Sequence, residues 1–289
     1  MPDPISPLGT PRVLVAAPEN PRHAHLAWPK LALTSNGVLI LVYSAGEFHG
    51  AHREGCPAVS VSSDNGTTFS DPQILAEFGE GENYTHCGNL AIGTTTDNAI
   101  ILIAMAYRGD EANSIFCWVS IDAGQTWQDI NVAALAAGRT GSVYGHIFSV
   151  PGRGYAVCGH FRAGSYPNDS GLWISFSQDG LHWGAPEQIS DESLVEPDDP
   201  DRVIAPVTER SIPNKTPSRI SIWTSSSLGL EWSEHGTVIE FPHEKGSANT
   251  DFGYPWMVKC EDGKWLIAFY FGQQKGPNAI WGLDFELGP

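Results

Sequence analysis

Three arginines stand at matching places in this chain, each directly after an apolar run typical of a β-strand. The runs end in Tyr107-Arg108, Phe161-Arg162 and Glu209-Arg210. Only 16 residues of the 289 are Lys or Arg, so three at matching positions stand out. Converging guanidinium groups bind a carboxylate through paired hydrogen bonds. The column predicts a site for an acidic ligand; in the alternative, each arginine pairs with a nearby acid such as Asp110.

The ten histidines form a second set with chemical potential. Five of them occupy matching places, near the start of one strand-like run or the end of the next: His25, His86, His146, His49 and His160. Such a group can transfer protons or bind a divalent metal. Its long-range spacing fits no compact metal motif, so hydrogen-bonded structural histidines are the favoured interpretation. A divalent cation, which Asp251 could help to bind, is the alternative.

A repeated turn sequence indicates which elements position these residues. The pattern Ser-x-Asp-x-Gly-x-Thr-aromatic occurs at 62–69 and 120–127, with altered copies at 177–183 and 225–232. Asp64, Asp122 and Asp179 follow one another at intervals of 58 and 57 residues. A fixed period of this size indicates one supersecondary unit copied several times. Because the Asp can accept backbone hydrogen bonds and the Gly allows a positive φ, these boxes are predicted to be structural turns rather than catalytic groups.

Overlaying the turns divides the chain into five β-units. Their expected strands are 28–33, 38–44 and 58–62; 86–93, 100–107 and 114–120; 144–150, 155–161 and 171–177; 193–196, 203–209 and 218–225; and 254–260, 265–271 and 279–285. The fifth unit lacks a box and an outer strand. The run 12–16 is well placed to supply that strand, which would close a ring and leave no exposed sheet edge.

The turns resemble the Asp box, or BNR repeat, of sialidases and related glycan-active β-propellers. This resemblance implies an all-β fold, a β-propeller of four-stranded antiparallel blades with residues 1–289 as one domain. The repeat count predicts five blades closed by the N-terminal strand, and six blades, the number in sialidases, is the alternative.

The same resemblance implies catalytic residues. Tyr254 is similar to the tyrosine nucleophile of retaining sialidases, and Glu196 to the glutamate that takes its proton. The family's acid/base aspartate has no clear counterpart in the loop of the first unit. That loop instead holds Glu47 and His49 as candidates for proton transfer.

Substrate-binding residues follow in the same way. Sialidases use three arginines to bind the sialic acid carboxylate, which would assign this role to Arg108, Arg162 and Arg210. The candidate set also includes His25, His86, His146 and His160. The chain departs from the family at 27–30, which reads Ala-Trp-Pro-Lys where the family's first arginine is expected.

Composition excludes several classes of partner. The net charge of −17 argues against nucleic acid and anionic membrane surfaces as partners. Five cysteines without regular spacing predict neither a disulfide framework nor a zinc motif, and they lean toward a reducing compartment. The N-terminus does not read as a signal peptide, so a cytoplasmic location is slightly favoured over a processed secreted form. The oligomeric state is left open.

Three functions fit these features, all with a carbohydrate partner. The first is a sialidase-like glycoside hydrolase that acts on the non-reducing end of a glycan, on an acidic sugar. The second is a polysaccharide lyase or other uronate-active enzyme, in which His or Tyr abstracts a proton. The third is a non-catalytic lectin. A lectin would repeat its site residues in every unit, and the units differ here, which favours an enzyme.

Overall fold

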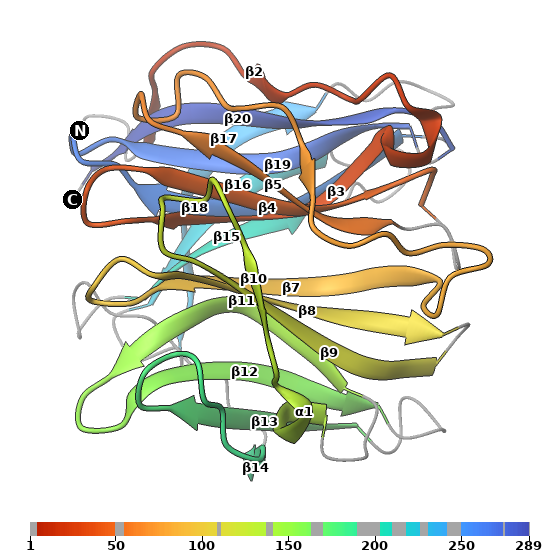
Figure 1. Ribbon diagram of the computed structural model, residues 1–289. Helices are drawn as coiled ribbons and strands as arrows, with labels where there is room; N and C mark the ends of the chain where they lie inside the picture. The colour runs from red at the N-terminus through yellow and green to blue at the C-terminus, as the bar shows by residue number, and fades with distance from the viewer. Residues whose placement is uncertain are drawn as a thin grey trace.

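The computed structural model describes residues 5–49, 55–108, 111–136, 141–162, 170–189, 203–209, 218–225, 231–241, 250–273 and 275–288. Within these ranges the chain consists of strands, apart from a short helix α1 (Ala133–Ala136) and the 3₁₀ turn Pro21–His23. The predicted all-β class is therefore confirmed. The described strands form three sheets (Figure 1).

The largest sheet joins the two ends of the chain. Its order is β18-β19-β20-β3-β4-β5-β6, with β1 and β2 both paired antiparallel to β20. The strands are β1 (Ile5–Pro7), β2 (Arg12–Val15), β3 (His25–Leu33), β4 (Leu39–Gly46), β5 (Cys56–Ser62), β6 (Gln73–Ile74), β18 (Thr250–Lys259), β19 (Trp265–Gln273) and β20 (Asn278–Leu287). The first strands of the chain (red) therefore lie beside its last strands (blue) in Figure 1.

The second sheet holds two antiparallel units side by side, in the order β10-β9-β8-β7-β11-β12-β13-β14. Its strands are β7 (His86–Thr94), β8 (Ile100–Arg108), β9 (Glu111–Ser120), β10 (Gln128–Ile130), β11 (Gly141–Val150), β12 (Gly154–Arg162), β13 (Ser170–Ser177) and β14 (Glu187–Ile189). The units meet where β7 and β11 pair in parallel. A similar parallel pair, Asn278 with His25, joins β20 to β3.

The third sheet is the antiparallel set β15 (Val203–Glu209), β16 (Ser218–Ser225) and β17 (Ser233–Phe241). The strand expected at 193–196 lies outside the described residues.

The box turns are braced internally. In the first box, the hydroxyl of Ser62 and the backbone and hydroxyl of Thr68 all donate to the Asp64 carboxylate. These bonds lower the pKa of Asp64 to about 2, chiefly through the Thr68 hydroxyl. The box of Asp122 repeats the same contacts. In both boxes, donors of the turn therefore bond to both oxygens of the carboxylate.

The three boxes that the structure describes also pack against a neighbouring unit. A Cβ added at Gly124 would lie within 3.4 Å of Val61 and Ile40, and one at Gly180 would meet Ile101 at 2.2 Å. A Cβ at Gly66, in the first unit, would meet Leu266 of β19 at 2.7 Å. These glycines are needed both for a positive φ and for this close approach. The first unit thus packs against the last unit in the same way as the second and third units pack against the units before them.

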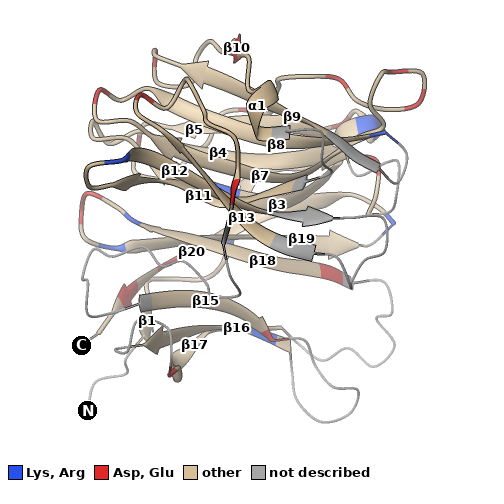
Figure 2. Cartoon of the chain, turned by 90° about the horizontal axis from the view of Figure 1, so that it is seen from below, with Lys and Arg blue, Asp and Glu red and all other residues tan. Residues whose placement is uncertain are grey.

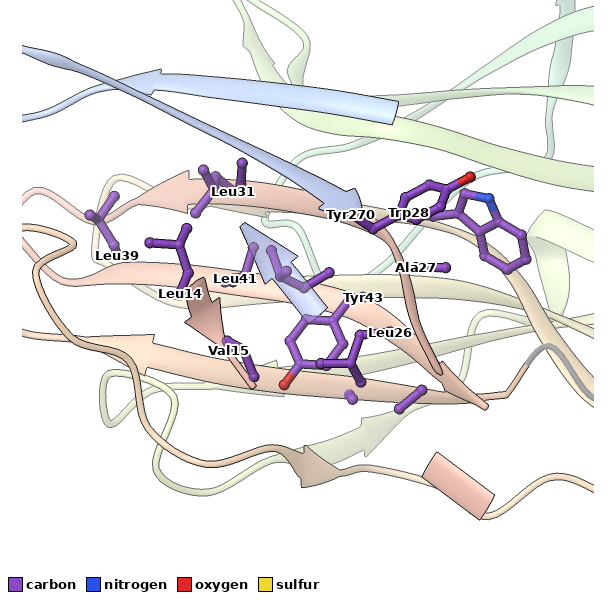
Figure 3. Packing of buried hydrophobic residues seen from close by; sticks show 14 of the residues in the cluster. Leu14, Val15, Leu26, Ala27, Trp28, Leu31, Leu39, Leu41, Tyr43 and Tyr270 are labelled. Atoms are coloured by element: carbon purple, nitrogen blue, oxygen red, sulfur yellow. The ribbon is translucent and has the colours of Figure 1, made fainter. Parts of the chain in front are cut away.

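The core lies between the units. The second strands β4 and β8 are buried on both faces, since side chains on each face meet a neighbouring unit. Their sequences accordingly read as continuous apolar runs. Figure 3 shows one such cluster, with Leu39 at one end and Trp28 at the other.

Most charged groups lie at the periphery, and Lys30 and Asp251 are buried exceptions. Figure 2 shows Asp and Glu (red) in many of the turns, with few Lys and Arg (blue). All five cysteines are free. In the part of the chain that the structure describes, no helix is long and apolar enough to cross a membrane.

Candidate active site

The first strands of four units carry a bulge at corresponding places. The bulges lie between Ala27 and Lys30, Cys87 and Leu90, Tyr144 and Ile147, and Gly253 and Trp256. Bulges re-aim side chains and occur often next to active sites. Three of these bulges contain a residue with positive φ: Trp28 at 55°, Gly145 at 58° and Tyr254 at 49°. A non-glycine residue in this region costs about 1–3 kcal/mol, so Trp28 and Tyr254 must be held by their surroundings.

A buried carboxylate occupies the place where the first and last units meet. Asp251, on β18, is 5% exposed. Its Oδ2 accepts a hydrogen bond from His49 Nδ1 at 2.7 Å, and its Oδ1 accepts one from the Tyr270 hydroxyl at 3.0 Å. His49 follows β4 and keeps 31% of its side chain exposed. The result is an imidazole held by a carboxylate and open to solvent on one side, an arrangement suited to proton transfer.

His25 is the third member of this cluster. This residue begins β3 and is 1% exposed. Its Nδ1 lies 3.1 Å from the Gly276 carbonyl oxygen, which can only accept, so Nδ1 carries the proton. Its Nε2 therefore presents a lone pair, 3.4 Å from the Asn278 amide nitrogen and 3.7 Å from Asp251 Oδ2.

Two aromatic side chains close a ring over this cluster. The Trp28 ring lies edge-on to His49 at 5.6 Å and to Tyr254 at 6.3 Å. Tyr254 in turn stacks on Tyr270 at 6.1 Å. Trp28 is buried, whereas Tyr254 is 48% exposed. The exposed phenol and imidazole thus open to the same surface; we call the set Trp28, His25, His49, Asp251, Tyr254 and Tyr270 the mouth.

The electrostatics of the mouth favour an ionised Asp251 and a neutral His25. Burial alone would raise the pKa of Asp251, but the hydrogen bonds from His49 and Tyr270 and the nearby imidazoles lower it overall. Burial lowers the pKa of His25, and its hydrogen bond to Gly276 and the charge of Asp251 offset this only in part.

The other predicted histidines lie in the neighbouring units. His86 is buried and stacks on Tyr107 at 4.4 Å. His146 stacks on Trp256 at 6.3 Å, and the buried Lys30 Nζ lies 5.3 Å over the same indole. Burial lowers the pKa of Lys30 to about 8. The structure therefore groups His25 with His49, and His146 with Lys30.

The arginine column is described only in part. Arg108 ends β8, where its Nε donates to the Asn83 carbonyl at 3.1 Å and its guanidinium lies 5.7 Å over Tyr84. Arg162 and His160 lie on β12, but their side chains are outside the described residues. Arg210 and Glu196 also fall outside them. Convergence of the three arginines stays a prediction. Glu47 is described, and is exposed just beyond β4.

A second histidine–acid cluster lies on the flank of the first unit. His23 Nε2 is 3.3 Å from Glu77 Oε2, and Cys56 Sγ is 3.8 Å from the same oxygen. His23 Nδ1 lies 3.4 Å from the Asn20 amide nitrogen. Arg22 also pairs with Glu77, at 3.5 Å. We call His23, Cys56 and Glu77 the flank cluster.

Sequence reasoning did not find Tyr270 or Asn278, and placed Trp28 only as a departure from a motif. Tyr270 is hidden inside the apolar run of β19, where an aromatic residue reads as core. Asp251 was predicted only as an additional ligand for a divalent cation, and the structure buries it. The available signal was its position at the start of β18, where a carboxylate on a first strand needs a partner.

The family model for the BNR repeat-like domain matches residues 9–267. The chain belongs to this family. The box turns that carry the BNR repeat in the sequence are the braced turns of the structure. The resemblance to the BNR repeat of sialidases is therefore supported by the family match. No curated protein matches the chain.

Solved structures share the fold of this BNR repeat-like protein at low identity. A protein of unknown function from Dyadobacter fermentans is 16% identical with a TM-score of 0.59, over 99% of this chain and 100% of that one. The Hadza microbial sialidase Hz136 is 17% identical with a TM-score of 0.54, over 96% of this chain and 59% of the sialidase. An N-acetylgalactosamine deacetylase from F. plautii is 12% identical with a TM-score of 0.54, over 98% of this chain and 95% of that one. The likeness places the chain among β-propellers.

Proposed function

We propose that the chain is a five-bladed propeller, closed by its N-terminal strands, that hydrolyses glycosides at the mouth. The antiparallel units follow one another in chain order, and β2 pairs with β20 of the last unit. The packing of Gly66 on Leu266 repeats the contact that the later boxes make with the units before them. Both contacts support closure between the first and last units.

The observation that carries the proposed activity is the pairing of an exposed Tyr254 with the His49–Asp251 hydrogen bond at one surface. Tyr254 is held at a positive φ, between Trp28 and Tyr270, with its phenol directed to no hydrogen-bond partner among the described residues. A phenol suits attack on an anomeric carbon that already bears a carboxylate, because a neutral nucleophile avoids charge repulsion.

The roles follow from this arrangement. Tyr254 acts as nucleophile, and proton transfer takes place at the His49–Asp251 pair, which Tyr270 keeps oriented. The Trp28 indole provides an apolar face beside them. Glu196 is the proposed proton acceptor for Tyr254. Arg108, Arg162 and Arg210 are the proposed ligands for the carboxylate of an acidic sugar at the non-reducing end of a glycan.

A second candidate is a lyase acting on uronates. The half-exposed His49, oriented by a buried carboxylate, is also the arrangement of a base that abstracts a carbon-bound proton. Elimination driven by such a base would leave an unsaturated uronate, whose conjugated double bond absorbs at ~232 nm. Hydrolysis leaves no such band.

The test is turnover of a panel of aryl glycosides, sialosides, uronate polysaccharides and N-acetylated sugars. We expect a new reducing end or free acidic sugar, and at least a hundredfold loss of kcat in Tyr254→Phe. The control Tyr155→Phe removes a phenol in the third unit that accepts a hydrogen bond from the Thr96 backbone, and it should keep full activity. An unsaturated product would favour the lyase, and release of acetate would favour deacylation, the activity in the F. plautii protein's name. Binding without turnover would favour a lectin, and equal activity of both variants would remove Tyr254 from the mechanism.

A further inference from the structure

The second histidine of the mouth has no role in a simple imidazole–carboxylate pair. His49 alone satisfies Asp251 Oδ2, and Tyr270 satisfies Oδ1. Yet His25 is fully buried with its Nε2 lone pair 3.7 Å from that same Oδ2. The Asn278 amide nitrogen at 3.4 Å can donate to this lone pair, but a cation between Nε2 and Oδ2 would interact favourably with both acceptors.

We propose that His25, His49 and Asp251 bind a divalent transition-metal cation. The coordinating atoms are His25 Nε2, His49 Nδ1 and Asp251 Oδ2, all within 4.8 Å of one another. Two imidazoles and one carboxylate form a recognised metal-binding set with open positions. The proposal rests on the mouth of the proposed function and deepens it, because an ion bound to His49 Nδ1 and Asp251 Oδ2 would pass the proton-transfer role of that pair to the water that the ion binds. The binding itself does not depend on turnover.

The distances suit such an ion. Bonds of about 2.0–2.2 Å to nitrogen and oxygen place neighbouring ligand atoms roughly 3–3.6 Å apart. The carboxylate oxygen lies 3.7 Å from His25 Nε2 and 2.7 Å from His49 Nδ1. Binding therefore requires Asp251 and His49 to move slightly apart, His25 to move slightly closer, and the proton that now joins Asp251 and His49 to leave. Metal binding would accordingly release a proton.

The surroundings already hold the ligands as a metal site requires. A metal-binding imidazole usually donates its other N–H to a carbonyl or carboxylate, and a ligating carboxylate is itself hydrogen-bonded. His25 donates Nδ1–H to the Gly276 carbonyl, and Asp251 Oδ1 accepts from the buried Tyr270. Among the described residues, no Lys or Arg pairs with Asp251, so its charge is available to a cation.

The open positions face the substrate side. His49 is the exposed member of the set, and Trp28 and Tyr254 lie next to it. A divalent cation here would polarise a ligand oxygen or lower the pKa of bound water. Its ligand class is an oxygen-rich sugar presented beside Tyr254.

The experiment uses the full chain, stripped with a chelator and titrated with Co²⁺ and Zn²⁺. We expect one equivalent of Co²⁺ to bind, with visible absorption bands and proton release, and with competition by Zn²⁺. His49→Gln should weaken Co²⁺ binding more than tenfold, and Asp251→Asn more than a hundredfold, while circular dichroism shows both folded. The matched control His23→Gln, in the flank cluster, should bind as the wild type does.

The outcomes separate the two proposals. Absence of binding at millimolar Co²⁺, or binding that His23→Gln abolishes and His49→Gln does not, would overturn the metal site. Binding in a chain that turns over none of the glycans supports the metal site and removes the proposed hydrolase. Turnover that persists after chelation, without Co²⁺ binding, supports the hydrolase and removes the metal site.

Discussion

The mouth and the flank cluster contain similar groups but differ in how their histidines are hydrogen-bonded. At the flank, Asn20 Oδ1 accepts from the Arg22 backbone, so its amide nitrogen faces His23 Nδ1. His23 therefore carries its proton on Nε2 and donates it to Glu77. At the mouth, His25 donates through Nδ1, so the Nε2 that faces Asp251 carries a lone pair, to which the Asn278 amide nitrogen at 3.4 Å can donate. The second hydrogen bond of each imidazole decides whether the cluster can accept a cation.

The two carboxylates differ as well. Glu77 has 48% of its side chain exposed and already pairs with Arg22, so its charge is both hydrated and compensated. Asp251 is buried and has imidazoles as its ion-pair partners. Among the described residues no Lys or Arg pairs with Asp251, and a buried anion without such a partner attracts a cation more strongly than an exposed one already paired with a guanidinium. Judged by residue types alone, both clusters offer three metal ligands, and the flank cluster would be expected to bind a metal more tightly because one of its ligands is a cysteine.

The sharpest way to break this comparison is to convert the flank cluster into a metal site. In Asn20→Asp, one carboxylate oxygen can keep the bond from the Arg22 backbone while the other accepts His23 Nδ1–H, which frees Nε2. Made in an Asp251→Asn background, this change should raise the Co²⁺ affinity of the protein at least a hundredfold over that of the Asp251→Asn variant alone. The signature is a thiolate-to-cobalt band from Cys56, which the mouth cannot give because it contains no sulfur.

The control for that experiment is Asn20→Ala in the same background, which removes the amide without supplying an acceptor. It should bind no better than Asp251→Asn alone. If the Ala variant gains the thiolate band as well, release of Asn20 rather than the tautomer of His23 controls binding, and the comparison fails.

The next effect concerns the Cys56 thiol. Burial raises its pKa to about 11, from an ordinary value near 9. At pH 8 the folded protein should therefore hold about a hundredfold less Cys56 thiolate than the unfolded chain and react correspondingly slowly with iodoacetamide. The rate should rise as the pH approaches 11, and mass spectrometry of the labelled peptide measures it. Labelling that is accelerated by a chelator at neutral pH would instead mean that the native flank cluster binds metal.

The fold was accessible from sequence because its signals are local. The first three boxes keep Ser, Asp, Gly and an aromatic within one turn, and Asp64 and Asp122 satisfy the same donors in the structure. The buried second strands read as apolar runs, since a strand packed on both faces has no polar side. The pairing of 12–15 with β20 could be inferred because the last unit lacked an outer strand.

The site was accessible only in part because its contacts span the whole chain. His49 and Asp251 are 202 positions apart and meet only when the first and last units come together. Nothing local marks Tyr270 as a partner of Asp251, nor reveals that a bulge turns Trp28 and Tyr254 to positive φ. The set of matching histidines contained His25 and His49, which the structure brings together, and also His86, which stacks on Tyr107 in another unit.

The smallest expected effect tests whether a residue that is not itself a ligand, Tyr270, raises the metal affinity of the mouth by orienting Asp251. Tyr270→Phe removes only the hydroxyl that donates to Asp251 Oδ1, so all three ligands remain but the carboxylate can rotate. Removing such a partner costs roughly 10–100-fold in metal affinity, and we expect the low end, near tenfold. Tyr43→Phe is the matched control: it deletes an equally buried hydroxyl on β4, which bonds to Ser60 on β5. Because both variants lose one buried hydrogen bond, their melting temperatures should fall alike, while only Tyr270→Phe weakens Co²⁺ binding in a calorimetric titration. Equal affinities in the two variants would mean that Asp251 is held by His49 alone, and that burial rather than orientation distinguishes the mouth from the flank.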